Sequence, residues 1–376
     1  MIEQKRLGDI ATYINGFAFK PEDRGTVGLP IIRIQDLTGN AYDLGFYAGN
    51  YPERIEINDG DVLISWSASL GVYVWDKGKA LLNQHIFKVV FDKCEVNREY
   101  FVYAVRYKLK EMESKTHGAT MKHIVKKDFD NTLIPFPTLE EQENIANLLD
   151  KISTIILVRQ QQLQKLDELV KARFVELFGD PISNPHGFDK VDLSELADIK
   201  IGPFGSLLHK GDYIEGGYAL LNPSHIIDGK IAPDSELTVS REKYEELSAY
   251  HLKAGDVVMG RRGEMGRCAV VPCDGYLCGT GSLLIRTKGD VTADYIQKII
   301  SFPSFKKAIE DMAVGQTMPN LNVPIVSKFQ IIKPPIEVQH SYYAFVEQTD
   351  KSKVAVQKSL DEAQLLFDSL MQQYFG

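Results

Sequence analysis

The strongest constraint on this chain is an internal repeat, because several short motifs occur twice in the same order. Three of them recur 197 residues later: Gly118-Ala119-Thr120-Met121 as Gly315-Gln316-Thr317-Met318, Leu139-Glu140-Glu141-Gln142 as Ile336-Glu337-Val338-Gln339, and Phe178-Gly179 as Phe375-Gly376. The interval between corresponding residues differs in the earlier part of the chain, where Asp61 corresponds to Asp256 at an interval of 195. A sequence written twice predicts two similar domains on a shared framework, with the more variable regions lying between the repeated motifs.

The first repeated segment, residues 139–180, predicts one long helix. Thr138 and Glu141 have the spacing of a capping box, and Gly179 is a typical helix end. Apolar residues follow at alternating steps of four and three, which is a heptad seam. The seam consists of Ile145, Leu149, Ile152, Ile156, Leu163, Leu166, Val170 and Phe174, with Arg159 in one position.

The second repeated segment, residues 336–376, predicts a second long helix. Its seam contains Tyr342, Val346, Val356, Leu360, Ala363, Phe367 and Leu370, with Thr349 and Lys353 as weaker positions. Such stripes can serve simple core packing. Two long seams separated by a whole domain favour packing of one helix on the other.

The remaining residues form two mixed α/β domains, residues 1–138 (the first head) and residues 181–335 (the second head). Short strands bounded by turn residues are predicted at 29–34, 61–65 and 86–91, and a short helix at 98–112. The expected fold class is therefore α+β, with two pseudo-symmetric α/β domains and two long helices.

The net charge of −8 argues against a simple basic DNA-binding module. The long-helix segments are the most acidic parts, and neither head is basic overall. DNA binding would then need local patches or a partner that supplies phosphate contacts. The chain has no long apolar run and only 4 cysteines, so we expect a cytoplasmic protein without a membrane span or a disulfide framework.

Motifs for methyl transfer or nucleotide binding are missing from the sequence. An adenine methyltransferase needs a site that grips the flipped base, commonly Asn-Pro-Pro followed by an aromatic residue. Asn184-Pro185-His186 lacks the second proline and the aromatic, and is better interpreted as a linker turn. No glycine-rich loop has the spacing of a dinucleotide or phosphate-binding loop.

Metal-dependent chemistry is also not predicted. Asp92 with Glu113-Ser114-Lys115 has the loose spacing of a nuclease site, but such triplets are common by chance. Cys268, Cys273 and Cys278 do not have the spacing of a zinc knuckle. We therefore expect no catalytic residue, no metal and no cofactor in this chain.

The ordered motifs resemble those of the specificity subunits of Type I restriction–modification enzymes, over essentially the whole chain. The resemblance rests on Ile57–Ile64 and its counterpart Leu252–Met259, on Gly118–Ile124 and Gly315–Leu321, and on Ile134–Gln142 and Ile332–Gln339. It implies two target recognition domains, each reading one half of a split double-stranded DNA site. It further implies an antiparallel coiled coil of the two helices, two modification subunits bound to these helices, and restriction subunits that cut.

Candidate base readers are polar residues that we expect to be exposed in turns, where they can approach a groove. They are Ser65, Trp66, Ser67, Asn83, Gln84, His85, Lys122 and His123 in the first head, and Asn222, Ser224, His225, Arg261, Arg262, Thr280, Ser282 and Asn320 in the second. A structural role is the alternative for each of them. Arg261-Arg262 is the strongest prediction, because two adjacent arginines between Gly260 and Gly263 are rarely part of a core.

Two other functions remain open at this point. The chain could be the specificity subunit of a Type IIB-like system, or a coiled-coil adaptor that binds no DNA. The sequence does not identify the recognised bases, because the pairing of side chains with bases depends on the docked pose.

Overall fold

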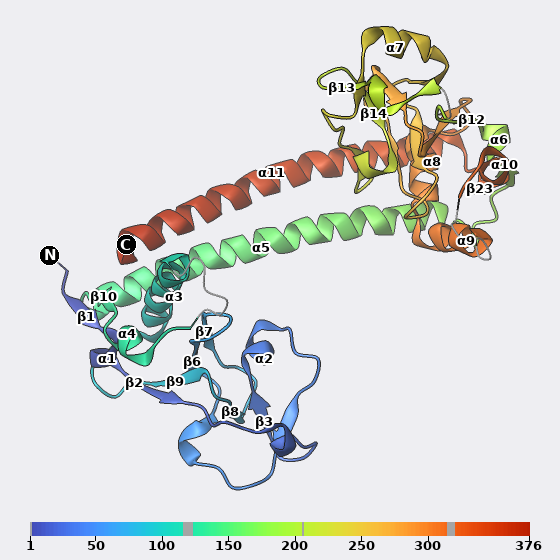
Figure 1. Cartoon of the computed structure of the whole chain (residues 1–376). Helices are drawn as coiled ribbons and strands as arrows, with labels where there is room; N and C mark the ends of the chain where they lie inside the picture. Colours follow the sequence, from blue (N-terminus) through green and yellow to red (C-terminus); the bar gives the residue numbers. More distant parts are fainter. Residues whose placement is uncertain (1, 116–122, 205–206, 314–319) are drawn as a thin grey trace. The chain divides into compact units, whose positions relative to one another are not determined.

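The computed structural model describes residues 2–115, 123–204, 207–313 and 320–376 (Figure 1). The chain divides into two compact units. Unit 1 comprises Met1–Gln162 and Val356–Gly376, and unit 2 comprises Leu163–Ala355. Each unit thus contains one head and a part of each long helix. None of the helices in the described ranges is long and apolar enough to cross a membrane.

In its described residues, the first head contains two four-stranded sheets and four α-helices. Its elements are β1 Gln4–Arg6, α1 Leu7–Ile10, β2 Thr12–Asn15, β3 Leu29–Ile32, α2 Ile34–Thr38, β4 Gly45–Tyr47, β5 Glu56–Ile57, β6 Val62–Ser65, β7 Gly71–Val74, β8 Ala80–Leu82, β9 Ile86–Val90, α3 Arg98–Lys115, α4 Lys126–Asp130 and β10 Leu133–Pro135. The sheets have the orders β2-β9-β6-β7 and β4-β3-β8-β5, and β1 pairs with β10. The strands and the helix predicted for this head are therefore present.

The second head repeats this plan with additions. Its elements are β11 Lys190–Asp192, α6 Leu193–Leu196, β12 Ala197–Ile201, β13 Tyr213–Ile214, β14 Tyr218–Leu221, β15 Ile226–Ile227, β16 Lys230–Ile231, β17 Thr238–Val239, α7 Arg241–Glu246, β18 His251–Leu252, β19 Val257–Gly260, β20 Cys268–Val270, β21 Tyr276–Cys278, β22 Ser282–Thr287, α8 Ala293–Ile300, α9 Pro303–Ala313, α10 Val323–Ser327 and β23 Gln330–Ile332. The sheet order β12-β22-β19-β20 matches that of the first head, and β13 extends the other sheet to β13-β17-β14-β21-β18.

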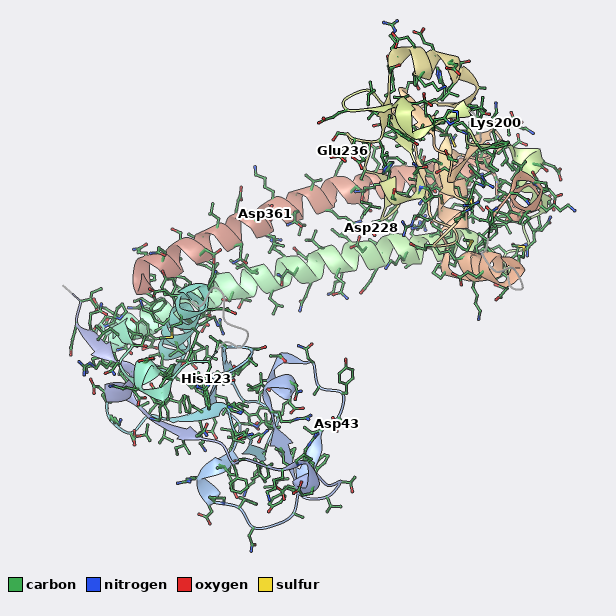
Figure 2. All side chains as sticks on the ribbon, viewed as in Figure 1. Asp43, His123, Lys200, Asp228, Glu236 and Asp361 are labelled. Atoms are coloured by element: carbon green, nitrogen blue, oxygen red, sulfur yellow. The ribbon has the colours of Figure 1, made fainter. Side chains whose placement is uncertain are left out.

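Two 40-residue helices, α5 (Leu139–Phe178) and α11 (Ile336–Phe375), follow the two heads in the sequence. The capping box predicted for α5 is present, since the Thr138 N–H donates to Glu141 Oε2 (3.0 Å) and the Glu141 N–H donates to Thr138 Oγ1 (3.3 Å). Every predicted seam position on both helices is buried or half-buried. Other side chains, such as Asp361 on α11, are exposed (Figure 2).

The two helices run antiparallel where they meet in each unit. In unit 1, Ala146 and Leu149 near the start of α5 share a core with Met371 and Phe375 near the end of α11. In unit 2, Phe178 at the end of α5 packs on Tyr342 near the start of α11, with ring centroids 5.4 Å apart. The expected antiparallel helix pair is therefore present in both units.

The repeated motifs at the helix ends have matching structural roles. Gln142 accepts a hydrogen bond from the Asn97 N–H (3.0 Å), and Gln339 accepts one from the Thr292 N–H (3.0 Å). Each head is also contacted by the end of the helix that follows the other head. Phe375 packs on Tyr100 in unit 1, and Phe178 packs on Tyr295 in unit 2, both with ring centroids 5.2 Å apart.

Candidate nucleic-acid interface

Three predicted residues of the first head meet at the ends of β6 and β9. The Trp66 N–H donates to the His85 carbonyl oxygen (3.2 Å), and the Ile124 N–H donates to the Trp66 carbonyl oxygen (2.9 Å). The indole ring lies 4.8 Å from the His85 ring and 4.8 Å from the His123 ring, measured between centroids. His123 is exposed at this edge (Figure 2). Trp66, His85 and His123 thus form one aromatic cluster, which we call the Trp66 cluster.

The turn from β8 to β9 adds Asn83 and Gln84 to the same region. The Gln84 N–H donates to the Phe17 carbonyl oxygen (2.9 Å), so this turn lies beside the segment after β2. His85 has a left-handed backbone, with φ of 73°. Asn83 Oδ1 and His85 Nδ1 are buried and have no hydrogen-bond partner within the described chain. Buried polar atoms without a partner are unusual, so this turn has polar groups that can bind a water molecule or a ligand.

Arg261 of the second head occupies the position that Trp66 occupies in the first. Its N–H donates to the Gly281 carbonyl oxygen (2.9 Å), and its carbonyl oxygen accepts from the Leu321 N–H (3.0 Å). Its side chain also donates from Nε to the Leu321 carbonyl oxygen (3.0 Å). The loop after β19 therefore has the same backbone connections as the loop after β6, but it presents a guanidinium in place of an indole.

The two arginines of this loop differ in their surroundings. Arg261 is half-buried, and this burial, together with the neighbouring charge of Arg262, lowers the pKa of its guanidinium. Arg262 is exposed and has no hydrogen-bond or ion-pair partner within the described ranges. Arg262 thus keeps its whole donor set available, whereas Arg261 uses part of its own to hold the loop.

The Arg261 loop is braced by charged residues that the sequence did not single out. Glu264 accepts from Lys306 Nζ (2.7 Å) and from Arg267 Nη2 (2.8 Å). These contacts, that of Lys306 first, lower the pKa of Glu264 to about 2, so the carboxylate stays charged at neutral pH. Because Lys306 lies on α9, the loop is tied to this helix.

The other predicted residues of the second head lie around the same loop. Asn222 Oδ1 accepts from the Gly281 N–H (3.3 Å), and the Thr280 carbonyl oxygen lies 3.5 Å from Arg261 Nη1. Thr280 and Ser224 are exposed, and Asn320 is half-buried next to Leu321. Lys122 lies outside the described residues.

The predicted exposure is wrong for Ser65, Ser67, His225 and Ser282, all of which are buried. Ser65 Oγ donates to the Ser69 carbonyl oxygen (2.6 Å), and Ser282 Oγ donates to the Leu221 carbonyl oxygen (2.8 Å). His225 Nδ1 lies 2.9 Å from the Leu220 carbonyl oxygen. Turn residues look exposed in a sequence, but these side chains satisfy backbone groups that would otherwise be buried without a partner.

Asn15 at the end of β2 is a further residue of this region that sequence reasoning missed. Its Oδ1 accepts from Trp66 Nε1 (3.2 Å), although the two residues are 51 positions apart. No local sequence pattern signals this contact, because it depends on the pairing of β2 and β6 with the two edges of β9.

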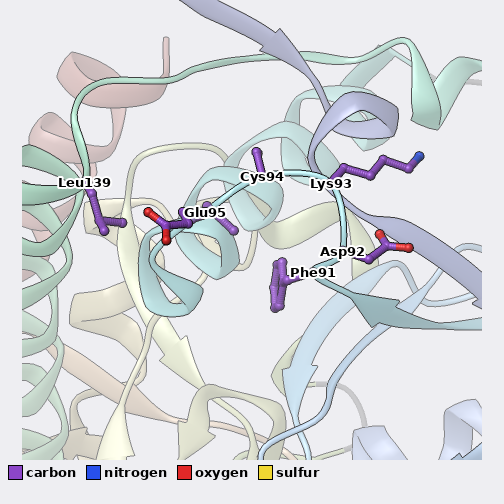
Figure 3. A pocket seen from close by; sticks show the side chains of 7 residues that line it. Phe91, Asp92, Lys93, Cys94, Glu95 and Leu139 are labelled. Atoms are coloured by element: carbon purple, nitrogen blue, oxygen red, sulfur yellow. The ribbon is translucent and has the colours of Figure 1, made fainter.

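A separate pocket of about 560 Å³ lies between the segment after β9 and the start of α5 (Figure 3). Asp92 accepts from Thr12 Oγ1 (2.8 Å), and Lys93 Nζ donates to the Gly8 carbonyl oxygen (2.5 Å). These two charged groups are therefore bonded within the head. In the described ranges, no three His, Cys, Asp or Glu side chains are close enough together to hold a metal ion.

Comparison with known proteins supports the duplicated architecture. Residues 2–168 and 185–363 each match the family model of the Type I restriction modification DNA specificity domain. The chain is 23% identical to the Type I restriction enzyme EcoBI specificity subunit of Escherichia coli, over 97% of this chain and 83% of that protein. It is 22% identical to the Type I restriction enzyme MjaVIII specificity subunit of Methanocaldococcus jannaschii, over 76% of this chain and 71% of that protein.

Two solved structures share the fold. One, from work on complex assembly and conformational transition of the type I R-M system, has a TM-score of 0.64 at 17% identity and covers 99% of this chain and 97% of its own. The other, the S subunit of a Type I restriction–modification system from M. genitalium, has a TM-score of 0.57 at 15% identity and covers 100% of this chain and 96% of its own. At these identities the structural likeness concerns the fold alone.

Proposed function

The chain belongs to the Type I restriction modification DNA specificity family, and from this premise we propose that it reads a bipartite double-stranded DNA site for partner subunits that methylate and cut. In this function each head reads one half-site, and the chain itself carries out no catalysis. The observation that carries the proposal is the pair of equivalent strand-end loops, which present Trp66 in the first head and Arg261 in the second on the same backbone connections. Two loops with the same backbone connections but different side chains suit two heads that recognise different bases.

The long helices are the proposed docking surface for two modification subunits. In unit 1, Ile155, Leu157 and Val158 of α5 and Leu365 and Leu366 of α11 are exposed. Exposed apolar side chains on a helix favour a protein partner, and the acidic character of these segments disfavours contact with DNA phosphates. Restriction subunits would then bind to the complex of this chain with the modification subunits.

We expect the helices to set the interval between the half-sites. Four residues inserted into each helix at matched positions would lengthen each helix by about 6 Å. The unmethylated gap between the half-sites should then grow by roughly one or two base pairs, at about 3.4 Å each. Methylation mapping of the insertion variant measures this gap, and an assembled complex with an unchanged gap contradicts the spacer role.

The experiment that tests the proposed function is methylome sequencing of a host that expresses this chain with its modification subunit. The expected result is one split motif that is methylated only when both proteins are present. The control is the purified chain alone, which should neither methylate DNA with a methyl donor nor cut it with Mg²⁺. Methylation that does not depend on this chain would contradict the proposal and favour a non-DNA-binding adaptor.

A further inference from the structure

Each head exposes one phenylalanine shortly after the strand that begins its first sheet. Among the residues that the structure describes, Phe17 (38% exposed) and Phe204 (61% exposed) are the exposed phenylalanines. Both follow the strand that begins the first sheet of their head, β2 or β12. Large aromatic side chains are normally buried, so one exposed ring at a corresponding place in each head needs an explanation.

A glycine before each phenylalanine brings the chain against the turn that carries the candidate readers. The Gly16 N–H donates to the Ile86 carbonyl oxygen (3.1 Å), and the Gly202 N–H donates to the Ser282 carbonyl oxygen (3.1 Å). A Cβ atom on Gly16 would lie 2.0 Å from the Asn83 carbonyl oxygen, and one on Gly202 would lie 1.9 Å from the Gly279 carbonyl oxygen. No side chain fits in either place, so both heads use glycine for this close approach.

The close approach fixes Phe17 beside Asn83 and Gln84. The Phe17 N–H donates to the Leu82 carbonyl oxygen (2.8 Å), and the Phe17 carbonyl oxygen accepts from the Gln84 N–H (2.9 Å). The Phe17 ring packs on Phe19 with centroids 5.0 Å apart. Phe17 is thus held in a defined place while more than a third of the residue stays exposed.

In the second head a proline shifts the aromatic by one residue. Pro203 follows Gly202 and is buried, and Phe204 is the exposed residue. The second head therefore keeps Gly202 against the turn from β21 to β22 and exposes a ring two residues later, whereas the first head exposes a ring directly after Gly16. This difference would let the two rings meet their half-sites at different base pairs.

We infer that Phe17 and Phe204 make apolar contacts with thymine methyl groups in the major groove, one in each half-site; this inference rests on the proposed function. The 5-methyl group of thymine is the apolar feature of the major-groove edge, and phenylalanine is one of the side chains that contact it. Polar side chains on the adjacent turn, such as Asn83 and Gln84, can hydrogen-bond to base edges, and the phenylalanine ring adds an apolar contact that these side chains do not make.

The test replaces thymines of the mapped motif by uracil, one at a time, and measures affinity for the complex of this chain with its modification subunit. For the wild-type complex, replacing one particular thymine of the first half-site by uracil should weaken binding of the duplex about 4-fold, which is the effect of losing one buried methyl group. The Phe17→Ala complex should bind the unmodified duplex about 4-fold more weakly and show no further loss with that uracil. Phe204→Ala should do the same in the second half-site.

Matched controls separate this contact from general effects of lost apolar surface. Tyr42, which is fully exposed in the first head, and Ile182, which is 41% exposed, provide the variants Tyr42→Ala and Ile182→Ala. Both should keep the wild-type affinity and the uracil penalty. Phe17→Leu should keep part of the penalty, because an apolar side chain remains.

Three results would overturn the inference. The first is that both alanine variants bind the duplex with wild-type affinity. The second is that in one half-site no replacement of thymine by uracil weakens binding. The third is that uracil weakens binding equally for the wild type and the variant. A rise in the fluorescence of 2-aminopurine in the duplex that depends on Phe17 would show that bases unstack. Phe17 would then insert between base pairs and would not contact a thymine methyl group. A wild-type complex that prefers no sequence at all would instead contradict the proposed function.

Discussion

The two heads of this protein share a frame but present different chemistry at the same position. Trp66 in the first head and Arg261 in the second have the same backbone connections to the neighbouring turn and to the segment before the helix α4 or α10. Around Trp66 the structure places aromatic rings, whereas around Arg261 it places backbone carbonyl oxygens. The comparison shows that the backbone of the loop can be kept while its side chain is changed, which is what a family of sequence readers requires.

The two heads also differ in how their frames are stabilised. Asp61 pairs with Lys88 (2.9 Å), and the equivalent Asp256 pairs with Arg286 (2.6 Å). The Asp61 side chain is 24% exposed and that of Asp256 is 3% exposed. The second head thus buries the aspartate more deeply, while its basic partner comes from a different position on the paired strand and is more exposed (38% for Arg286, 18% for Lys88).

The largest effect is expected when one head is exchanged. Replacing residues 181–335 by the corresponding head of another specificity subunit should change one half of the methylated motif completely and leave the other half unchanged. The reason is that each head has its own core and its own candidate readers. Methylome sequencing of the chimera checks this, and a motif altered in both halves would show that the heads do not read independently.

Substitution of the shared glycines should damage both heads. Gly202→Ala places a Cβ atom 1.9 Å from a backbone oxygen, and Gly16→Ala places one at 2.0 Å, so each should destabilise its head by about 3 kcal/mol. Chemical unfolding monitored by amide hydrogen exchange reports each head separately. Gly211→Ala is the control, since no atom lies within 4 Å of its added Cβ. Normal stability of both variants would contradict the shared close approach.

The ion pairs of the two equivalent aspartates should respond unequally to loss of the basic partner. Arg286→Ala leaves the buried Asp256 carboxylate without its partner and should destabilise the second head by about 3 kcal/mol. Lys88→Ala leaves Asp61 with partial access to water and should cost the first head about 1 kcal/mol. Urea unfolding of the two variants measures the difference. Equal losses would show that the depth of the aspartate does not decide the contribution.

A further prediction concerns the two arginines of the second head. At least one of Arg261→Ala and Arg262→Ala should lose about 1–3 kcal/mol of discrimination between specific and scrambled duplex, the value of a bidentate contact with guanine. A phosphate contact would instead weaken all sequences alike and lower the salt slope by about one. Affinities over a salt series tell the two apart. If both variants keep affinity, specificity and salt slope, the loop makes no contact with DNA.

The amino-acid sequence by itself determined the duplication, the two long helices and the residues of their seams. These features are local or periodic, so spacing alone reveals them: Thr138 and Glu141 cap α5 as predicted, and the seam from Ile145 to Phe174 is buried or half-buried throughout. The interval of 195 between Asp61 and Asp256 also relates Trp66 to Arg261, although it does not show what either side chain contacts.

Only the tertiary structure decided which polar residues are available and which residues meet. Ser65 and Ser282 look like exposed turn residues in the sequence, but pairing with neighbouring strands buries both, and Ser282 Oγ donates to the Leu221 carbonyl oxygen, 61 positions away. The close approach of Gly202 to Gly279 and the packing of Phe375 on Tyr100 join residues that are far apart in the chain. Such contacts depend on how sheets and helices pack together, and no local pattern in the sequence records that packing.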